Sequence, residues 1–279
     1  MTDPVVMRCA VLGSPIAHSL SPVLHRAAYA ALDLPWTYEA VECAEAGLPE
    51  LLAGLGAEWR GLSLTMPLKR AVLPLLDEAE PLVGQVGAAN TVVLDGGRRR
   101  GLNTDVPGLL AALAAHGLPV PEEAAVLGGG ATAASAVAAL GLGGARRIRL
   151  QVRRPRAADP VMAVAAAFGV ALEVAPFDPA DVALSLPLVV STVPGDAAAG
   201  LSAAVPERPG TLFDVVYDPW PTALAAAWSA RGGTVLGGFE LLLHQAGLQV
   251  EAFCGRPAPL AAMREAGEAA VRARGALKA

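Results

Sequence analysis

Short apolar runs alternate with stretches of helical periodicity along the first hundred residues. The runs that predict strands lie at residues 7–13, 36–43 and 61–64, and a hairpin with a Gly-Gly turn is predicted at 89–104. The stretches that predict helices lie at residues 22–31 and 47–55, from about Pro67 onward, and at 106–116. Because the two kinds of element follow each other in turn, the pattern indicates layered α/β structure.

A second series of apolar runs follows residue 119 and has a different spacing. Helical or glycine-rich stretches separate its members, which lie at residues 124–127, 147–152, 171–177, 186–195, 210–219 and 232–238. This pattern is typical of a parallel sheet with crossover helices. Residues 239–253 and 259–274 predict two final helices that can return to the first half. The chain is long enough for two domains, and two are predicted.

The composition argues against several classes of function. Lys and Arg total 21 against 26 Asp and Glu, which gives a formal net charge of −5, and aromatic residues make up 4%. Without a basic block or stacking aromatics, no nucleic-acid partner is expected. Cys9, Cys43 and Cys254 lie far apart, which predicts reduced thiols rather than a disulfide framework or a zinc site.

Nothing in the sequence predicts secretion or a membrane partner. The first residues lack the basic and long apolar regions of a signal peptide, so a cytoplasmic location is expected. Residues 124–145 carry no charge and are long enough to span a bilayer. Their glycines instead divide them into a short strand, a tight turn and an alanine-rich helix.

The turn in this segment matches a dinucleotide-binding pattern. It reads G-x-G-x-x-A between a predicted strand and a predicted helix, and comprises Gly128, Gly129, Gly130, Ala131, Thr132 and Ala133. Small residues there let backbone amides approach a pyrophosphate at the helix N-terminus. A tight strand-to-helix turn without a ligand is the alternative interpretation.

Arginines follow the next predicted strand, where an NAD enzyme has an acidic residue for the ribose hydroxyls. The segment reads Val152-Arg153-Arg154-Pro155-Arg156. Guanidinium groups suit a 2′-phosphate through paired hydrogen bonds, so NADP is preferred over NAD as the cofactor. A solvated basic strand end is the alternative.

Polar side chains also stand at the ends of apolar runs in the first half. Three serines and a histidine crowd into SPIAHSLSP at residues 14–22, and His18 is expected to brace this loop. Lys69 is predicted in the first turn of a helix, where a cation opposes the helix dipole, so a reason other than local stability is sought for it. Each such residue alone also fits a cap, a turn or an exposed position.

Five segments together resemble a known family. They are GSPIAHSLSP at 13–22, LTMPLK at 64–69, GAANT at 87–91, NTD at 103–105 and GFELLLHQA at 238–246. In order and approximate spacing the chain resembles the shikimate dehydrogenases over nearly its whole length. Quinate/shikimate dehydrogenases and related paralogues share the same frame.

The resemblance implies NADPH-dependent, reversible reduction of 3-dehydroshikimate to shikimate, on the chorismate route to aromatic amino acids. It implies a substrate domain at residues 1–105 with a mostly parallel sheet, completed by helices within 237–279, and a Rossmann domain at 106–236. The expected partner is this small-molecule substrate, with the protein a monomer or a homodimer. An NAD-dependent quinate or aminoshikimate dehydrogenase and a non-catalytic NADPH-binding sensor are the alternatives.

The resemblance also assigns residues. Ser19 and Ser21 would contact the substrate carboxylate, Thr65 and Asn90 would hold ring hydroxyls, and Tyr217 and Gln245 would complete the pocket. Lys69 and Asp105 would form the catalytic pair. The predicted cofactor site comprises the glycine turn, Arg153, Arg154 and Gly238.

The implied chemistry fits these residue types. Reducing a ring ketone with a hydride requires a proton for the new alkoxide, which Lys69 can donate and, in reverse, take back. Asp105 would orient the ammonium group and bond the substrate hydroxyl. The four histidines are scattered without metal-ligand spacing, so no metal is predicted.

The chain departs from the family at several positions. The family usually has Asn-Arg-Thr where Arg153-Arg154-Pro155 stands. It often has Asn where Ser14 and Ser63 stand, and Gly is common where Glu240 stands. None of these departures removes a named catalytic group.

Overall fold

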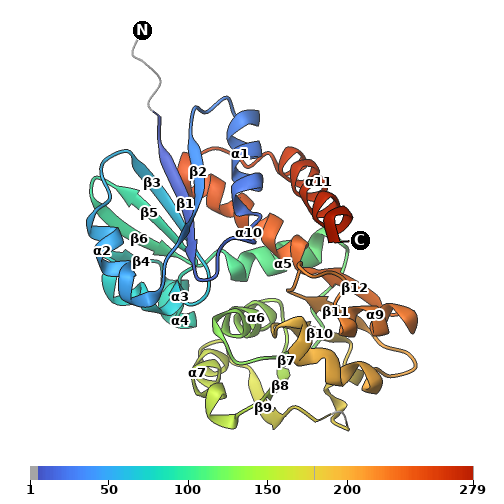
Figure 1. The fold of residues 1–279 in the computed structure, drawn as a ribbon. Helices are drawn as coiled ribbons and strands as arrows, with labels where there is room; N and C mark the ends of the chain where they lie inside the picture. The colour runs from blue at the N-terminus through green and yellow to red at the C-terminus, as the bar shows by residue number, and fades with distance from the viewer. Residues whose placement is uncertain (1–5, 179, 279) are drawn as a thin grey trace. The chain divides into compact units, whose positions relative to one another are not determined.

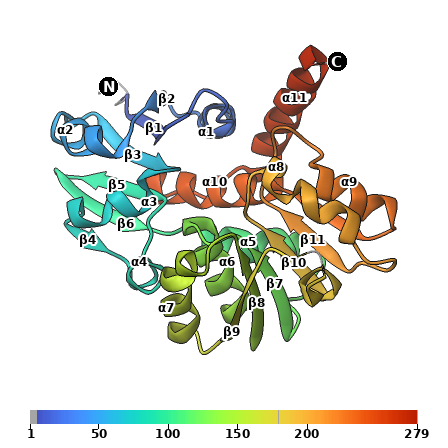
Figure 2. The same cartoon turned by 60° about the horizontal axis from the view of Figure 1, so that its bottom comes forward.

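The chain forms two compact units. The computed structural model describes residues 6–178 and 180–278. The terminal unit comprises Met1–Gly84, Ala88–Thr104 and Leu242–Ala279, and the central unit comprises Gln85–Gly87 and Asp105–Leu241. Each unit contains a six-stranded sheet, and the mostly parallel sheets confirm the predicted α/β fold class (Figures 1 and 2).

The sheet of the terminal unit has the strand order β2-β1-β3-β5-β6-β4. Its strands are β1 (Arg8–Gly13), β2 (Thr37–Glu42), β3 (Trp59–Leu64), β4 (Glu78–Ala79), β5 (Thr91–Asp95) and β6 (Arg98–Leu102). β1 pairs in parallel with β2 and β3, whereas β5 is antiparallel to both β3 and β6. The predicted hairpin is confirmed, because Gly96 and Gly97 turn the chain with φ of 56° and 81°, values that favour glycine.

Helices from both ends of the chain belong to the terminal unit. They are α1 (Ser21–Ala31), α2 (Leu48–Ala53), α3 (Leu68–Ala71), α11 (Leu260–Lys278) and most of α10 (Gly238–Cys254). α4 (Pro81–Val86) spans the boundary of the two units. α1 packs against α11, and Figure 1 shows the two helices side by side. Gly61 of β3 lets α10 approach the sheet, because a Cβ at this position would overlap the ring of Phe253.

The central unit is a Rossmann-type sheet. Its strand order is β12-β11-β10-β7-β8-β9, and every pair is parallel. The strands are β7 (Glu123–Leu127), β8 (Arg147–Val152), β9 (Ala171–Pro176), β10 (Leu188–Ser191), β11 (Thr211–Asp214) and β12 (Thr234–Gly237). The helices are α5 (Asp105–Ala115), α6 (Ala131–Leu142), α7 (Asp159–Ala167), α8 (Gly195–Ala198) and α9 (Ala223–Ala230). The order reverses between β7 and β10, where such sheets bind ligands at their carboxyl edge.

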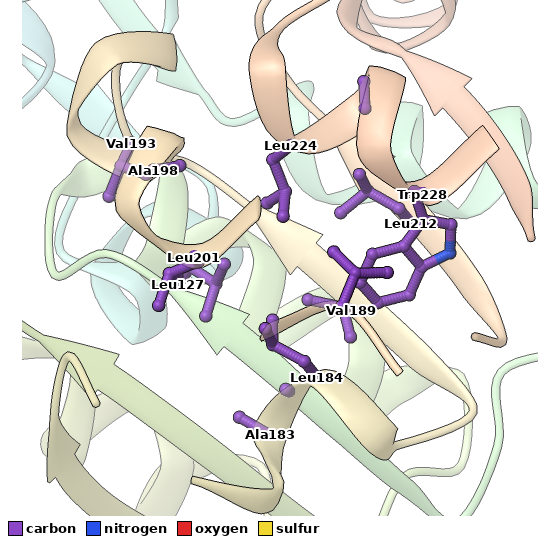
Figure 3. Packing of buried hydrophobic residues seen from close by; sticks show 13 residues of the cluster. Leu127, Ala183, Leu184, Val189, Val193, Ala198, Leu201, Leu212, Leu224 and Trp228 are labelled. Atoms are coloured by element: carbon purple, nitrogen blue, oxygen red, sulfur yellow. The ribbon is translucent and has the colours of Figure 1, made fainter. Parts of the chain in front are cut away.

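One face of this sheet is covered by an apolar cluster, shown in Figure 3. Leu127 and Val189 of the sheet pack with Leu201, Leu224 and Trp228. The Trp228 indole Nε1 donates a hydrogen bond to the Gly210 carbonyl at 3.0 Å, so the buried ring leaves its polar atom paired. Ala125, two residues before Leu127 on β7, belongs to the same cluster, and because side chains alternate along a strand, Ala124 and Val126 face the opposite side of the sheet.

The uncharged stretch at 124–145 is divided as predicted between β7, a glycine turn and α6. Within the residues that the structure describes, no helix is both long enough and apolar enough to cross a membrane.

Candidate functional site

Polar residues of the terminal unit gather at one edge of its sheet. The parallel strands β1 and β3 end at this edge, and because β5 and β6 form an antiparallel hairpin, β5 begins and β6 ends there. The predicted site residues that belong to this unit are Ser19, Ser21, Thr65, Lys69, Asn90 and Gln245. The first five lie on the connections at this edge, and Gln245 comes from α10.

The loop between β1 and α1 carries Ser19, and Ser21 is the first residue of α1. Backbone contacts fix this loop. The Ser14 amide donates to the Met66 carbonyl at 2.9 Å, which joins this loop to the segment after β3. Gly13 permits the approach, because a Cβ there would lie 2.9 Å from the same carbonyl. The Ser21 amide donates to Ser19 Oγ at 3.2 Å, so the two predicted carboxylate contacts are tied together.

Backbone hydrogen bonds fix the segment that contains Thr65 and Lys69, one within the segment and one from the residues before β5. The Leu68 amide donates to the Thr65 carbonyl, and the Ala89 amide donates to the Lys69 carbonyl, each at 2.8 Å. The helix here is only the single turn Leu68–Ala71. Lys69 lies in the first turn, as predicted, but in so short a helix it lies in the last turn as well, so the helix dipole neither opposes nor favours its charge.

Asn90 is the centre of a buried hydrogen-bond network. Its Nδ2 donates to Thr104 Oγ1 at 2.9 Å and to Gln245 Oε1 at 3.3 Å, and its Oδ1 accepts from the Thr104 amide at 2.8 Å. The Asn90 side chain is 1% exposed. The structure thus brings together Asn90 and Gln245, two predicted substrate contacts that are 155 residues apart.

A second set of hydrogen bonds connects β2, β3 and α10 to this network and orients it. Tyr38 Oη donates to Ser63 Oγ at 2.6 Å, and Ser63 Oγ donates to Gln249 Oε1 at 2.8 Å. The Gln249 Nε2 then donates to the Asn90 carbonyl at 3.2 Å and to Thr91 Oγ1 at 3.1 Å. Thr91 Oγ1 in turn donates to Asn90 Oδ1 at 2.9 Å. Each bond fixes the direction of the next, because a hydroxyl that donates once accepts from elsewhere.

Sequence reasoning did not find this supporting set. One signal was available for Gln249, which lies four residues after Gln245 on α10 and so shares its face. Tyr38 and Ser63 carried no such signal, because they stand on different strands whose register the sequence does not show.

The central unit places the glycine turn at the carboxyl edge of its sheet. Gly128 has a φ of 114°, and a Cβ there would overlap the Thr192 side chain. Gly130 is the N-cap of α6, and no side chain caps the helix. The first amides of α6 are thus left for another acceptor, the arrangement that suits a phosphate.

Arg153 and Arg154 follow β8 at the same edge. β8 lies beside β7 in parallel register, with Leu127 opposite Gln151, so the arginines and the glycine turn leave adjacent strands. Both arginine side chains are exposed.

The loop after β11 carries Tyr217 and is organised by a buried aspartate. Thr222 Oγ1 donates to Asp214 Oδ2 at 2.7 Å, and the Val216 amide donates to Oδ1 at 3.2 Å. Burial raises the pKa of the Asp214 carboxyl, although the bond from Thr222 lowers it. Gly238 closes against this loop, because its amide donates to the Val216 carbonyl at 3.1 Å and a Cβ would overlap the Val215 carbonyl.

The predicted catalytic pair is divided between the units. Lys69 belongs to the terminal unit, whereas Asp105 is the first residue of α5 in the central unit and directly follows Thr104. Asp105 is 5% exposed. The pairing of these two side chains therefore stays a prediction.

Known proteins resemble the chain over most of its length. Residues 11–92 match the family model of the shikimate dehydrogenase substrate binding domain. A shikimate dehydrogenase (NADP(+)) from Thermus thermophilus is 36% identical, and the alignment covers 95% of this chain and 99% of that protein.

Solved structures share the fold. The shikimate dehydrogenase from Mycobacterium tuberculosis is 43% identical, with a TM-score of 0.88 over 94% of this chain and 99% of that one. A shikimate 5-dehydrogenase from Thermus thermophilus, solved in complex with NADP(H) and shikimate, is 34% identical, with a TM-score of 0.83 over 95% and 99% of the two chains. On this similarity in sequence and structure, the chain belongs to the shikimate dehydrogenase family.

Proposed function

We propose that the protein catalyses the NADP-dependent interconversion of 3-dehydroshikimate and shikimate. The observation that carries this proposal is the convergence of Ser19, Ser21, Thr65, Lys69, Asn90 and Gln245 on one edge of the terminal sheet. Hydroxyl, amide and ammonium groups in one place suit a small acid that carries several hydroxyls. The relative from Thermus thermophilus that was solved with NADP(H) and shikimate supports the assignment.

The central unit has the residues that the dinucleotide requires. Gly128 keeps the turn free of a Cβ, and the uncapped start of α6 offers amides to a pyrophosphate. Arg153 and Arg154 are exposed at the end of the adjacent strand, where guanidinium groups can hold a 2′-phosphate. NADPH, when bound, supplies a hydride to the substrate carbonyl carbon. We therefore assign the central unit to the dinucleotide and the terminal unit to the acid.

The terminal unit binds and orients the acid in this proposal. The hydroxyls of Ser19 and Ser21 donate to its carboxylate, and the pair is already joined by the bond from the Ser21 amide to Ser19 Oγ. Thr65, Asn90 and Gln245 hold ring hydroxyls. The bonds to Thr104 and Gln245 orient the Asn90 amide before the substrate binds, which limits the further loss of side-chain entropy. A ring hydroxyl would take the place of the longer of the two bonds from Nδ2, the 3.3 Å bond to Gln245. Tyr217, from the loop that Asp214 organises, completes the contacts.

Proton transfer is assigned to Lys69. As the carbonyl carbon of 3-dehydroshikimate gains a hydride, its oxygen gains a proton from the Lys69 Nζ, and a hydroxyl results. In the reverse direction the neutral amine accepts the hydroxyl proton. Asp105 orients the ammonium group and accepts a hydrogen bond from the substrate hydroxyl.

The first test compares substrates and cofactors. The purified protein is given shikimate or quinate, each with NADP or with NAD, and formation of reduced nicotinamide is followed by absorbance. We expect kcat/KM to be highest for shikimate with NADP, because the arginines favour a 2′-phosphate and the serine loop favours a small acid. A preference for quinate or NAD would overturn the proposed specificity, and no turnover with any pair would leave a non-catalytic nucleotide-binding protein.

The second test addresses proton transfer. Lys69→Ala should lower kcat by about 10² to 10⁴ while leaving the affinity for NADP unchanged, since general acid–base catalysis contributes about this factor. Lys69→Arg keeps the charge but cannot release a proton near neutral pH, so it should lose turnover as well. Near-normal kcat in either variant would contradict the role assigned to Lys69.

A further inference from the structure

The last helix of the chain contacts the loop between β1 and α1, which contains Ser19 and leads into Ser21 at the start of α1. Arg274 of α11 donates from one guanidinium nitrogen to the His18 carbonyl at 2.8 Å and from the other to the Ser19 carbonyl at 3.5 Å. The His18 side chain was expected to brace this loop, but it is exposed. The Ile16 amide is held by Glu42 Oε2 at 3.0 Å, so the loop has one ionised contact near its start and another beside the serines.

The opposite end of α1 has a comparable contact. Arg256, which precedes α11, donates to the Leu32 carbonyl at the C-cap of α1, at 2.7 Å. α1 and α11 pack side by side between these two points (Figure 1). Each arginine donates to a backbone carbonyl next to α1: Arg256 at the C-cap of the helix and Arg274 in the loop before it. Only Arg274 reaches the loop that carries Ser19.

The bonds from Arg274 determine how the serines face a ligand. A peptide unit is planar, so holding the His18 carbonyl also fixes the Ser19 amide, which donates to the Ile16 carbonyl at 2.9 Å. Ser19 Oγ already accepts from the Ser21 amide. Its hydroxyl proton is therefore the group left for a bound anion. The guanidinium also adds positive charge behind this site, which strengthens donation to a carboxylate.

We propose that Arg274 is a positioning residue for the carboxylate of the substrate. It acts through the backbone of residues 18 and 19 and does not itself touch the ligand. This inference rests on the proposed function, in which Ser19 and Ser21 receive that carboxylate.

The test compares Arg274→Gln with the matched variant Arg256→Gln in the full chain. Steady-state oxidation of shikimate gives KM for shikimate, KM for NADP and kcat, and thermal unfolding gives the stability of each variant. Arg274→Gln should raise KM for shikimate about tenfold, the size of one charge-assisted hydrogen bond, and leave KM for NADP and kcat within about twofold. Arg256→Gln should leave all three constants unchanged.

A third variant and the wild type separate the remaining outcomes. Arg274→Lys keeps the charge but can reach fewer carbonyls, so its KM for shikimate should lie between wild type and Arg274→Gln. If Arg274→Gln fails to fold, Arg274→Lys decides: a raised KM supports the inference and a wild-type KM overturns it. Equal KM values in the Arg274 and Arg256 variants would overturn the inference while the proposed function stands. A wild type that neither oxidises nor binds shikimate would overturn both.

Discussion

His25 shows how one buried side chain couples stability to pH. The ring is fully buried and stacks on Tyr38 with 3.9 Å between ring centroids, and its Nδ1 bonds to the Ser21 carbonyl at 2.9 Å. Because that bond needs a proton on Nδ1, the neutral ring has its lone pair on Nε2, which has no hydrogen-bond partner among the described residues. Burial lowers the pKa of His25 to about 4, although the bond to Ser21 raises it.

This pKa predicts acid destabilisation over a defined range. The unfolded chain binds a proton at His25 below about pH 6.5, whereas the folded chain binds it only near pH 4. Stability from the neutral ring is therefore present above pH 6.5 and is lost as the pH falls to 4. Between pH 7 and pH 5 the free energy of unfolding should fall by about 2 kcal/mol more in the wild type than in His25→Phe.

Urea unfolding at the two pH values measures this difference. His18→Gln, which removes an exposed histidine from the loop before α1, should keep the full acid loss. An equal loss in the wild type and His25→Phe would show that His25 is not responsible.

At the scale of residues, the sequence located the groups at the ends of apolar runs but not those that support them. Asn90 could be identified because it stands in GAANT, one of the five segments that resemble the family. Gln249 and Arg274 act across the fold, and Arg274 contacts a carbonyl 256 positions away. Such contacts depend on packing, so neither propensity nor local spacing predicts them.

At the scale of elements, the contact of β3 with α10 depends on one missing side chain. A Cβ at Gly61 would overlap the ring of Phe253, which is 0% exposed. Phe253 also packs near His25, with 6.1 Å between ring centroids. The glycine is thus required by packing rather than by backbone conformation.

Gly61→Ala should therefore destabilise the protein. Overpacking of this kind costs about 1–3 kcal/mol, and the loss should appear as a lower urea midpoint. The matched control is Gly47→Ala, since a Cβ at Gly47 meets nothing within 4 Å, and its stability should stay within about 0.5 kcal/mol of wild type. Equal midpoints for the two variants would contradict this account of the contact.

Most of the longer elements could be predicted from the sequence, because runs of buried apolar residues alternate with helical periodicity. The Gly96-Gly97 hairpin and the division of residues 124–145 are confirmed. The two-residue strand β4 was not predicted, and for α3 only the start of a helix near Pro67 was predicted and not its end at Ala71. Elements this short have no hydrophobic period to recognise. Tertiary contacts stabilise them, and the sequence alone does not show such contacts.

At the scale of the whole molecule, the fold class follows from two sheets of different strand order. The central sheet has the order expected when each strand is followed by a crossover helix, which the spacing of apolar runs predicts. The terminal sheet mixes parallel strands with a hairpin, and the hairpin brings Asn90 to the edge where β1 and β3 end. Because β5 runs antiparallel to β3, polar residues that are far apart in the sequence lie together in one candidate site.

The terminal unit is built from the first and the last segments of the chain, so it can be completed only at the end of synthesis. Residues 1–104 leave the ribosome before Gln249 and Phe253 exist, whereas Asp105–Leu241 is continuous and can fold as it emerges. At about 5–20 residues per second, the first sheet waits on the order of ten seconds for α10 to cover it. During that wait Ser63 and Gly61 face an unfinished core. A prematurely ended copy would keep this exposed surface, which marks it for chaperones and proteases.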